Sequence, residues 1–234
     1  MAYDKFTLYH HPASRSSRAR WALIETLGNE GFDLVTFDLY EASQYDDDFL
    51  KKNPNHAVPV LAVTKDNETH HIFESGAIIL WLADSFPTAE LAPLANNFSL
   101  ERATFLQWFT FVSNSFDAML WQIRLNEELL PTEKADTKTP TRYREKITTD
   151  VEPQLVAQLA DNAYFLGDKF SAVDIILTHC LLWAQMYGLC THDKLNAYVE
   201  RMMARPSFLQ AYDDMDKFNP ALSDDAPLKD KLIG

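Results

Sequence analysis

The sequence predicts a small α/β domain followed by an all-helical domain. Short apolar segments bounded by turn residues, typical of strands, alternate with helical patterns in the first 85 residues. From about Ser99 onward the apolar residues recur at helical spacing. The intervening residues 86–98 contain Pro87, Pro93 and two asparagines and have no clean period, which indicates a linker. We therefore expect an α/β domain at residues 1–85, a linker at 86–98 and a helical domain at 99–234.

The elements of the first domain follow from local patterns. Lys5–Tyr9 alternates in polarity like a strand, whereas Ser14–Leu27 carries apolar residues at helical spacing and stops at Gly28. The later expected elements are a strand at Phe32–Leu39, an acidic loop at Asp46–Asp48, a hairpin formed by Pro59–Val63 and His70–Phe73, and a helix at Ser75–Ser85. This order, with its hairpin near the end, is typical of a thioredoxin-like domain.

The second domain is expected to be a bundle. Its predicted helices are Ser99–Arg124, Ala135–Ala160, Ser171–Tyr187, Asp193–Met203 and Pro206–Met215. Ser171 and Asp174 have the spacing of a capping box, with Phe170 as its hydrophobic staple, so we assign them a structural role. The last residues, Asn219–Gly234, are expected to form a loosely held tail.

Composition excludes several classes of partner. The net charge of −13 argues against nucleic acids and anionic membranes, which both demand a basic surface. No apolar run approaches the roughly 20 residues of a membrane-spanning helix. The two cysteines, Cys180 and Cys190, fall in a helical region and suggest buried thiols in a reducing cytoplasm. The pairs His10-His11 and His70-His71 lack the companions and spacing of a metal site.

Ser14 is the first candidate for chemistry. It can act simply as the N-cap of the helix that follows. However, Arg15, Arg18 and Arg20 occupy the first turns of that helix, where acidic residues are normally preferred. Such an arrangement suits the binding of an anion. We therefore expect Ser14 to donate a hydrogen bond to a thiolate, since no acid–base relay is evident that would make it a nucleophile. Ser16 and Ser17 lie within three residues of it and are the alternative donors.

Two further motifs suggest that the ligand is a peptide. Pro59 can start an edge strand, but in a thioredoxin-like domain a proline here is typically cis and exposes the backbone of Val58 for pairing with a bound peptide. Ser75 is a plausible N-cap of the next helix. Together with the helix amides it can hold a carboxylate while Glu74 receives an ammonium group. A free α-amino acid group offers both charges.

A polar stripe marks the first long helix of the second domain. Asn114, Asp117 and Trp121 recur at helical spacing and form either a solvated face or one wall of a cleft facing the first domain. Trp183 either packs in the core or forms the floor of the same cleft. We expect Asn114, Asp117, Trp183 and, from the first domain, His10 to line this cleft.

The chain resembles the cytosolic glutathione transferases from about Phe6 to Tyr212. The motifs that match in order and spacing are Leu8-Tyr9, Ser14, Arg18, Asn53-Pro54, Val58-Pro59, Glu74-Ser75, Phe170-Ser171, Asp174, Arg201-Met202 and Arg205-Pro206. The nine-residue gap from Tyr9 to Arg18 is similar to that of theta-type and bacterial members, whose catalytic Ser or Cys matches Ser14. Tyr9 is correspondingly less suited to catalysis. The helical domain resembles the bacterial beta class, with Ser14 in place of its Cys and Asp117 in place of a His.

This resemblance implies a cytoplasmic homodimer, with a role in detoxification, that binds glutathione as co-substrate through Ser14, Val58, Pro59, Glu74 and Ser75. Ala57 stands where many relatives have a glutamine, which leaves His56 as its substitute. The implied reaction is attack of the glutathione thiolate on a small hydrophobic electrophile, which would contact His10, Asn114, Asp117 and Trp183 in the expected cleft. The alternatives are a glutathione-binding or regulatory protein with little turnover, and a glutathione-dependent peroxidase or isomerase. A disulfide reductase with its own cysteine is disfavoured, because residues 1–179 contain none.

Overall fold

The structure, a computed structural model, describes residues 3–95, 99–218, 223 and 226–233. The chain divides into two compact units. The first unit combines Met1–Ala89 with Pro206–Gly234, and the second is Glu90–Arg205. Among the described helices, none has the length and apolar content required to cross a membrane.

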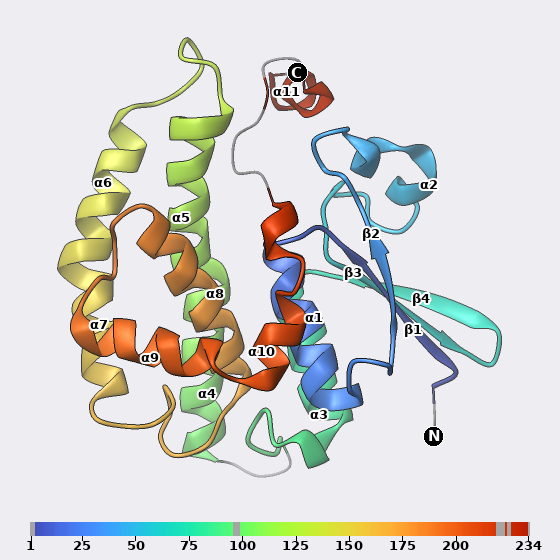
Figure 1. Ribbon diagram of the computed structural model, residues 1–234, viewed down its shortest axis with the longest axis horizontal. Helices are drawn as coiled ribbons and strands as arrows, with labels where there is room; N and C mark the ends of the chain where they lie inside the picture. The colour runs from blue at the N-terminus through green and yellow to red at the C-terminus, as the bar shows by residue number, and fades with distance from the viewer. Residues whose placement is uncertain (1–2, 96–98, 219–222, 224–225, 234) are drawn as a thin grey trace. The chain divides into compact units, whose positions relative to one another are not determined.

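The first unit contains a four-stranded mixed sheet with the strand order β2-β1-β3-β4 (Figure 1). The strands are β1 (Lys5–His10), β2 (Asp33–Thr36), β3 (Val60–Lys65) and β4 (Glu68–Phe73). β1 pairs in parallel with β2 and antiparallel with β3, which pairs antiparallel with β4. The β3–β4 turn consists of Asp66 and Asn67, both with positive φ, as a tight two-residue hairpin requires. The predicted thioredoxin-like topology is confirmed.

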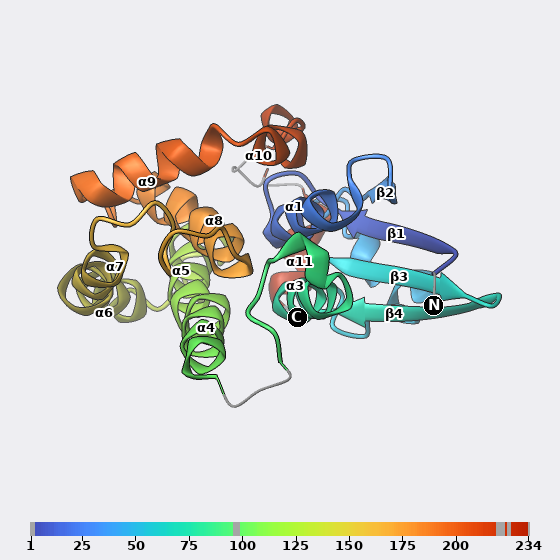
Figure 2. The same cartoon turned by 90° about the horizontal axis from the view of Figure 1, so that it is seen from below.

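Helices cover the sheet of the first unit. α1 (Arg15–Leu27) and α3 (Ser75–Ser85) lie side by side on one face, as Figure 2 shows. The short helix α2 (Asp47–Leu50) occupies part of the expected acidic loop and directs Phe49 towards Val58 and Val60. Because successive strand residues face opposite sides, Leu8 packs in the core under α1 and α3 while Tyr9 contacts Phe49.

The C-terminal segment belongs to the first unit, which differs from the domain boundaries expected from the sequence. Helix α10 (Pro206–Ala211) packs on α1 rather than completing the helical domain to residue 234. The physical reason is the fully buried Trp21 of α1, which meets Phe208 edge-on at 5.1 Å between ring centroids. Its indole N–H also donates to the hydroxyl of Ser207 at 3.0 Å.

Part of the expected loose tail is also structured. Helix α11 (Pro227–Ile233) follows, and the backbone N–H of Leu228 donates to the carbonyl of Tyr40 at 3.1 Å. The other residues of the expected tail, 219–222, 224–225 and 234, lie outside the described part of the chain, as do residues 96–98 of the expected linker.

The second unit is helical throughout, as expected. Its helices are α4 (Leu100–Thr110), α5 (Asp117–Arg124), α6 (Lys138–Lys146), α7 (Glu152–Leu159), α8 (Ala172–Met186) and α9 (Asp193–Met203). The two long helices expected from the sequence are each interrupted by π-helical turns, at Phe111–Phe116 and Ile147–Val151, and another π-helical turn, Leu125–Leu129, follows α5. α8 contacts α4, α5 and α9, and nearly all of its first ten residues are fully buried.

The N-terminus of α8 carries the predicted capping box. The carboxylate of Asp174 accepts from the backbone N–H and the hydroxyl of Ser171, at 2.8 and 3.0 Å. It also accepts from the N–H of Phe165 and from the hydroxyl of Tyr198, both at 2.8 Å. Asp174 therefore joins three segments of the helical unit within its core.

Candidate functional site

The register of the sheet gathers the three candidate motifs of the first unit at one edge. Tyr9, near the end of β1, pairs with Val60 at the start of β3, and Val60 pairs with Phe73 at the end of β4. Ser14 comes shortly after the end of β1 at this edge. Val58-Pro59 comes directly before the start of β3, and Glu74-Ser75 comes directly after the end of β4. Segments that are up to sixty residues apart in sequence thus meet at the same end of three adjacent strands.

The backbone at this edge adopts uncommon conformations. The Val58–Pro59 peptide bond is cis, as expected for this fold. Ala13, His56 and Glu74, each within two residues of a candidate motif, have positive φ angles of 53°, 43° and 68°. A residue with a Cβ atom in this region costs roughly 1–3 kcal/mol and persists where the surrounding structure imposes it, often at functional sites. Strain of this kind in all three segments supports the assignment of the site.

Two helices begin at the site. α1 begins at Arg15, after the N-cap Ser14, and α3 begins at Ser75. The expected capping role of Ser75 is wrong, because Glu74 holds the N-cap position and Ser75 is the first helical residue, largely buried. Both helix N-termini direct backbone N–H groups and the positive end of a helix dipole to this edge, which favours a bound anion.

The three arginines of α1 contribute unequally to this charge. Arg20 forms ion pairs with Asp213 at 2.7 Å and Asp214 at 3.4 Å. Arg18 is fully buried, and of the three only Arg15 retains a partly exposed side chain. The expectation that all three face an anion is therefore wrong for Arg20, whose charge is directed to the C-terminal segment.

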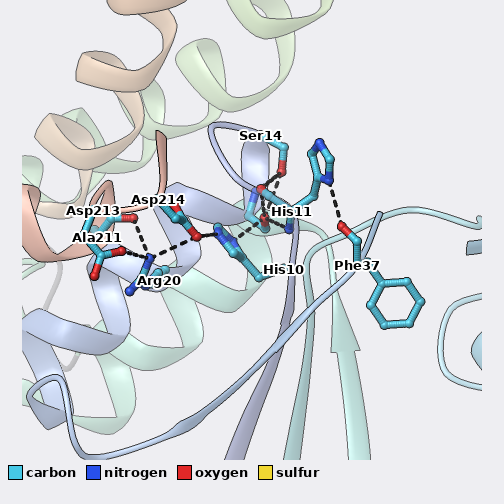
Figure 3. Close-up of polar contacts among 9 residues, drawn as sticks. His10, His11, Ser14, Arg20, Phe37, Ala211, Asp213 and Asp214 are labelled. Atoms are coloured by element: carbon cyan, nitrogen blue, oxygen red, sulfur yellow. Dashed lines mark hydrogen bonds and ion pairs between the residues drawn. The ribbon is translucent and has the colours of Figure 1, made fainter. Parts of the chain in front are cut away.

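Ser14 lies in a compact hydrogen-bond network at the start of α1 (Figure 3). Its hydroxyl lies 2.8 Å from the carbonyl of His11 and 2.8 Å from the hydroxyl of Ser16, and it accepts from the backbone N–H of Ser16 at 3.2 Å. Ser14 is half-buried, whereas Ser16 is fully buried. Both roles proposed for Ser14 are thus compatible, because it caps the helix and still holds a proton that can turn towards a ligand.

His10 does not line a cleft, contrary to the sequence-based expectation. Its side chain is fully buried, with Nδ1 2.7 Å from the hydroxyl of Ser16 and Nε2 3.1 Å from Oδ2 of Asp214 (Figure 3). His10 ends β1, and its side chain points to the face covered by the helices. Sequence reasoning offered Ser16 only as an alternative donor to the thiol, and it missed Asp214, because no local pattern connects residue 214 with residue 10.

The loop before Val58 is held by Asn53. Its side-chain N–H donates to the carbonyl of Ala57 at 2.8 Å, and its side-chain oxygen accepts from the N–H of Asn55 at 3.0 Å. The exposed His56 ring stacks on Tyr45, with centroids 4.3 Å apart and planes at 19°. Tyr45 in turn lies 5.4 Å from the ammonium group of Lys231 in α11. No local pattern in the sequence indicates these neighbours of His56.

The candidate electrophile residues of the helical unit differ in exposure. Asn114 is exposed, Asp117 is 5% exposed, and Trp121 and Trp183 are half-buried. The three residues of the expected stripe, Asn114, Asp117 and Trp121, therefore differ in burial, and the π-helical turn at Phe111–Phe116 changes the spacing at which residues share a face. Trp183 donates its indole N–H to the hydroxyl of Tyr187 at 3.4 Å.

A metal site requires several suitable ligands close together. Over the described ranges, no three His, Cys, Asp or Glu side chains come together in a way that could hold one.

Comparisons with known proteins match both parts of the chain. Residues 4–84 match the family described as "Glutathione S-transferase, N-terminal domain", and residues 120–206 match "Glutathione S-transferase, C-terminal domain". The glutathione S-transferase GstA of Escherichia coli O157:H7 is 27% identical over 210 residues, which cover 87% of this chain and 96% of that protein.

Solved structures show the same likeness. A sphingomonad glutathione S-transferase complexed with glutathione has a TM-score of 0.73 and 27% identity, over 90% of this chain and 98% of that one. A beta-class glutathione S-transferase of Sphingomonas chungbukensis has a TM-score of 0.72 and 28% identity, over 93% and 100% of the two chains. Both likenesses extend over nearly the whole fold.

Proposed function

Because the chain belongs to the glutathione S-transferase family, we propose that it activates the thiol of glutathione at Ser14 and that the resulting thiolate attacks a small hydrophobic electrophile. Glutathione is the co-substrate. The observation that carries the proposal is the meeting of Ser14, Val58 and Glu74-Ser75 at one edge of the sheet, beside two helix N-termini. This edge therefore offers a hydroxyl, a backbone segment and a polar pair of residues that support the binding of a short peptide thiol.

Each part of glutathione has a matching group at this edge. The N–H and C=O of Val58 are placed to pair with the cysteinyl backbone as an added strand. The N-terminus of α3 and the hydroxyl of Ser75 suit the γ-glutamyl carboxylate, and the exposed carboxylate of Glu74 suits its ammonium group. His56 lies at the loop before Val58, where it can contact the glycyl end.

Ser14 would lower the pKa of the bound thiol. A hydrogen bond to a charged acceptor contributes roughly 1.5–3 kcal/mol, and one pKa unit corresponds to about 1.4 kcal/mol. The hydrogen bond therefore lowers the pKa of the thiol by about one to two units, and the positive N-terminus of α1 lowers it further. The pKa of a free thiol is about 8.5, so a total shift of roughly two units makes the thiolate the main species at neutral pH.

The Ser14→Ala variant tests the role of this hydroxyl. Thiolate absorbance of the glutathione complex should titrate about one to two pH units higher, and conjugation of chlorodinitrobenzene at pH 7 should fall by about ten- to a hundredfold. Ser17→Ala is the matched control, because the Ser17 hydroxyl is buried and has no hydrogen-bond partner among the described residues. If the thiolate titration is unchanged in Ser14→Ala but shifted in Ser17→Ala, the assignment of this role to Ser14 is wrong.

Calorimetry tests the binding assignment. Ser75→Ala and Glu74→Gln should each weaken glutathione binding by roughly 1–3 kcal/mol, the range for a lost bond to a charged group. Affinity that stays constant in both variants would remove these two residues from the site.

We further propose that the electrophile contacts the helical unit at Asn114, Asp117 and Trp183, and that Trp183 offers the apolar surface. Substituting Trp183 by alanine should change the preference among aryl halides, enals and hydroperoxides and leave glutathione affinity unchanged. The same panel separates conjugation from peroxide reduction. Flat selectivity would place the electrophile elsewhere.

We also propose a homodimer that works in the cytoplasm. The proposal rests on the family and is supported by exposed apolar side chains at the start of the second unit, Leu100 at 85% and Leu94 at 60%, which a partner would cover. Sedimentation should give a species of twice the 26.8 kDa chain at micromolar concentration. A single 26.8 kDa species would contradict the dimer.

A further inference from the structure

A continuous chain of hydrogen bonds leads from Ser14 into the core of the first unit (Figure 3). The hydroxyl of Ser14 lies 2.8 Å from that of Ser16, which lies 2.7 Å from Nδ1 of His10. Nε2 of His10 lies 3.1 Å from Oδ2 of Asp214. Every link after Ser14 is nearly or fully buried, and the last one comes from the C-terminal segment.

The chemistry of the groups fixes the direction of this chain. Burial alone raises the pKa of Asp214, but the hydrogen bond to His10 and the charge of Arg20 hold it below its ordinary value. Asp214 is therefore a carboxylate at neutral pH and can only accept, so Nε2 of His10 carries a hydrogen. The neutral imidazole then accepts at Nδ1 from the hydroxyl of Ser16, which in turn can accept from Ser14.

Ser16 is held in this orientation by its surroundings. Its oxygen accepts from the backbone N–H of His11 at 3.0 Å, which leaves one lone pair for the hydroxyl hydrogen of Ser14. The hydroxyl of Ser16 lies 3.0 Å from the carbonyl of His11 but only 2.7 Å from Nδ1 of His10, so the imidazole is the nearer acceptor. A proton on Ser14 thus has a hydrogen-bonded route of two steps to His10.

Charged side chains surround the His10 ring. They are Asp214 from the C-terminal segment, Arg20 from α1, which contacts Asp214, and Asp213, which pairs with Arg20. The Asp213 side chain is 59% exposed and that of Asp214 only 9%, so Asp214 is the buried carboxylate next to His10. The second oxygen of Asp214 is also buried and has no hydrogen-bond partner within the described part of the chain. An imidazolium in this position would be costly without the carboxylate and is paired with it here.

We propose that His10 accepts the proton that bound glutathione loses, passed on through Ser14 and Ser16. The S–H bond breaks and its electron pair stays on sulfur, while the proton passes to the oxygen of Ser14. Ser14 gives its own proton to Ser16, and Ser16 gives its proton to Nδ1 of His10. Both serines end as hydroxyls, with that of Ser14 now directed to the thiolate, and His10 ends as an imidazolium beside the Asp214 carboxylate. The inference rests on the proposed function, and it makes His10, Ser16 and Asp214 positioning residues that act through Ser14.

The count of protons released on glutathione binding tests the relay. Thiolate is measured by its ultraviolet absorbance, and released protons by an indicator dye in weakly buffered solution at pH 7. In the unmodified protein the thiolate should exceed the released protons by up to one per site. In His10→Gln each thiolate formed should release about one more proton into solution than in the unmodified protein. An identical count in the two proteins, with thiolate present in both, would overturn the relay.

The pH dependence provides a second readout. Asp214→Asn keeps the size of the side chain and removes the negative charge that pairs with a protonated His10. Proton transfer to His10 should therefore be less favourable, and the thiolate fraction at pH 7 should fall by about three- to tenfold. Asp216→Asn is the matched control. This exposed carboxylate lies two residues further along the same segment and is not part of the hydrogen-bonded series from Ser14 to Asp214. Equal titrations for Asp214→Asn, Asp216→Asn and the unmodified protein would contradict the proposal.

Two measurements keep the test decisive if His10→Gln folds poorly. Ser16→Ala interrupts the chain without changing a charge and should give the same extra proton release. In the unmodified protein, nitrogen NMR of His10 should change from a neutral imidazole to an imidazolium when glutathione binds, and a ring that stays neutral would refute the relay. If Ser14→Ala forms thiolate normally, the proposed function fails. If Ser14→Ala loses the thiolate and the His10 readouts do not move, only the relay fails.

Discussion

Replacing Asp174 by alanine removes one carboxylate that accepts four hydrogen bonds in the core of the helical unit. Of the donors, the hydroxyl of Ser171 can rotate to another acceptor. The N–H groups of Phe165 and Ser171 and the hydroxyl of buried Tyr198 lose their acceptor. Leaving a buried donor unsatisfied costs about 1–3 kcal/mol. Taking the lower part of that range for three donors, we expect Asp174→Ala to lower the free energy of unfolding by about 3–5 kcal/mol.

Calorimetry and urea unfolding followed by circular dichroism measure this change. For a chain of this size each kcal/mol shifts the melting temperature by about 2–4 °C, so the expected decrease is roughly 6–20 °C. The geometry also ranks a milder variant. Asp174→Asn keeps the oxygen that accepts from Phe165 and Tyr198 but places an N–H₂ group against the N–H of Ser171. Its loss of unfolding free energy should therefore be about half that of Asp174→Ala.

The matched control is Asp161→Ala. This carboxylate also belongs to the helical unit and pairs with Lys194 at 2.7 Å, but 95% of its side chain is exposed. The melting temperature of this variant should equal that of the unmodified protein within error. If Asp174→Ala melts no earlier than Asp161→Ala, the hydrogen bonds of Asp174 do not stabilise the fold and the reasoning is refuted.

Three further predictions concern stability and reactivity. Trp21→Phe should lower the free energy of unfolding by about 2 kcal/mol, because the bond to Ser207 is lost and a void remains; an unchanged urea midpoint would count against the packing of α10 on α1. The folded-state pKa of Asp214 is lowered, so its stabilising contribution is present above about pH 4 and is lost as the pH falls through that lower pKa. The difference in unfolding free energy between the unmodified protein and Asp214→Asn should therefore shrink below about pH 4. A difference that grows there would mean that folding raises the pKa of Asp214, contrary to the prediction. Burial raises the pKa of the Cys190 thiol to about 12, so iodoacetamide at pH 8 should modify Cys190 only after unfolding, as mass spectrometry would detect.

Local patterns were sufficient for much of the fold. Ser14 caps α1 and Gly28 ends it, because capping depends on residues within one turn of each other. The spacing of Ser171 and Asp174 predicted the capping box for the same reason. The cis bond before Pro59 could be expected once the strand order was known. In each case the residues that determine the structure are neighbours in the sequence or belong to one supersecondary motif.

The errors arise where the determining contact is distant. Asp214 reaches His10 across 204 positions, and only the packing of α10 on Trp21 places it there. The side-chain spacing of Asn114 and Asp117 depends on a π-helical turn, which has no strong sequence signature and is decided by the packing of the bundle. His56 was expected to contact the ligand, and its stacking on Tyr45 depends on the path of two loops.

The return of residues 206–234 to the first unit has a consequence for the order of events during synthesis. The first unit emerges from the ribosome without α10, so the ring of Trp21 lacks its cover until all of Glu90–Arg205 has followed. At about 5–20 residues per second this interval is on the order of ten seconds. During it the helical unit, which is continuous in sequence, can fold first, although its residues are made later. The sheet domain, begun first, is therefore the last to be completed.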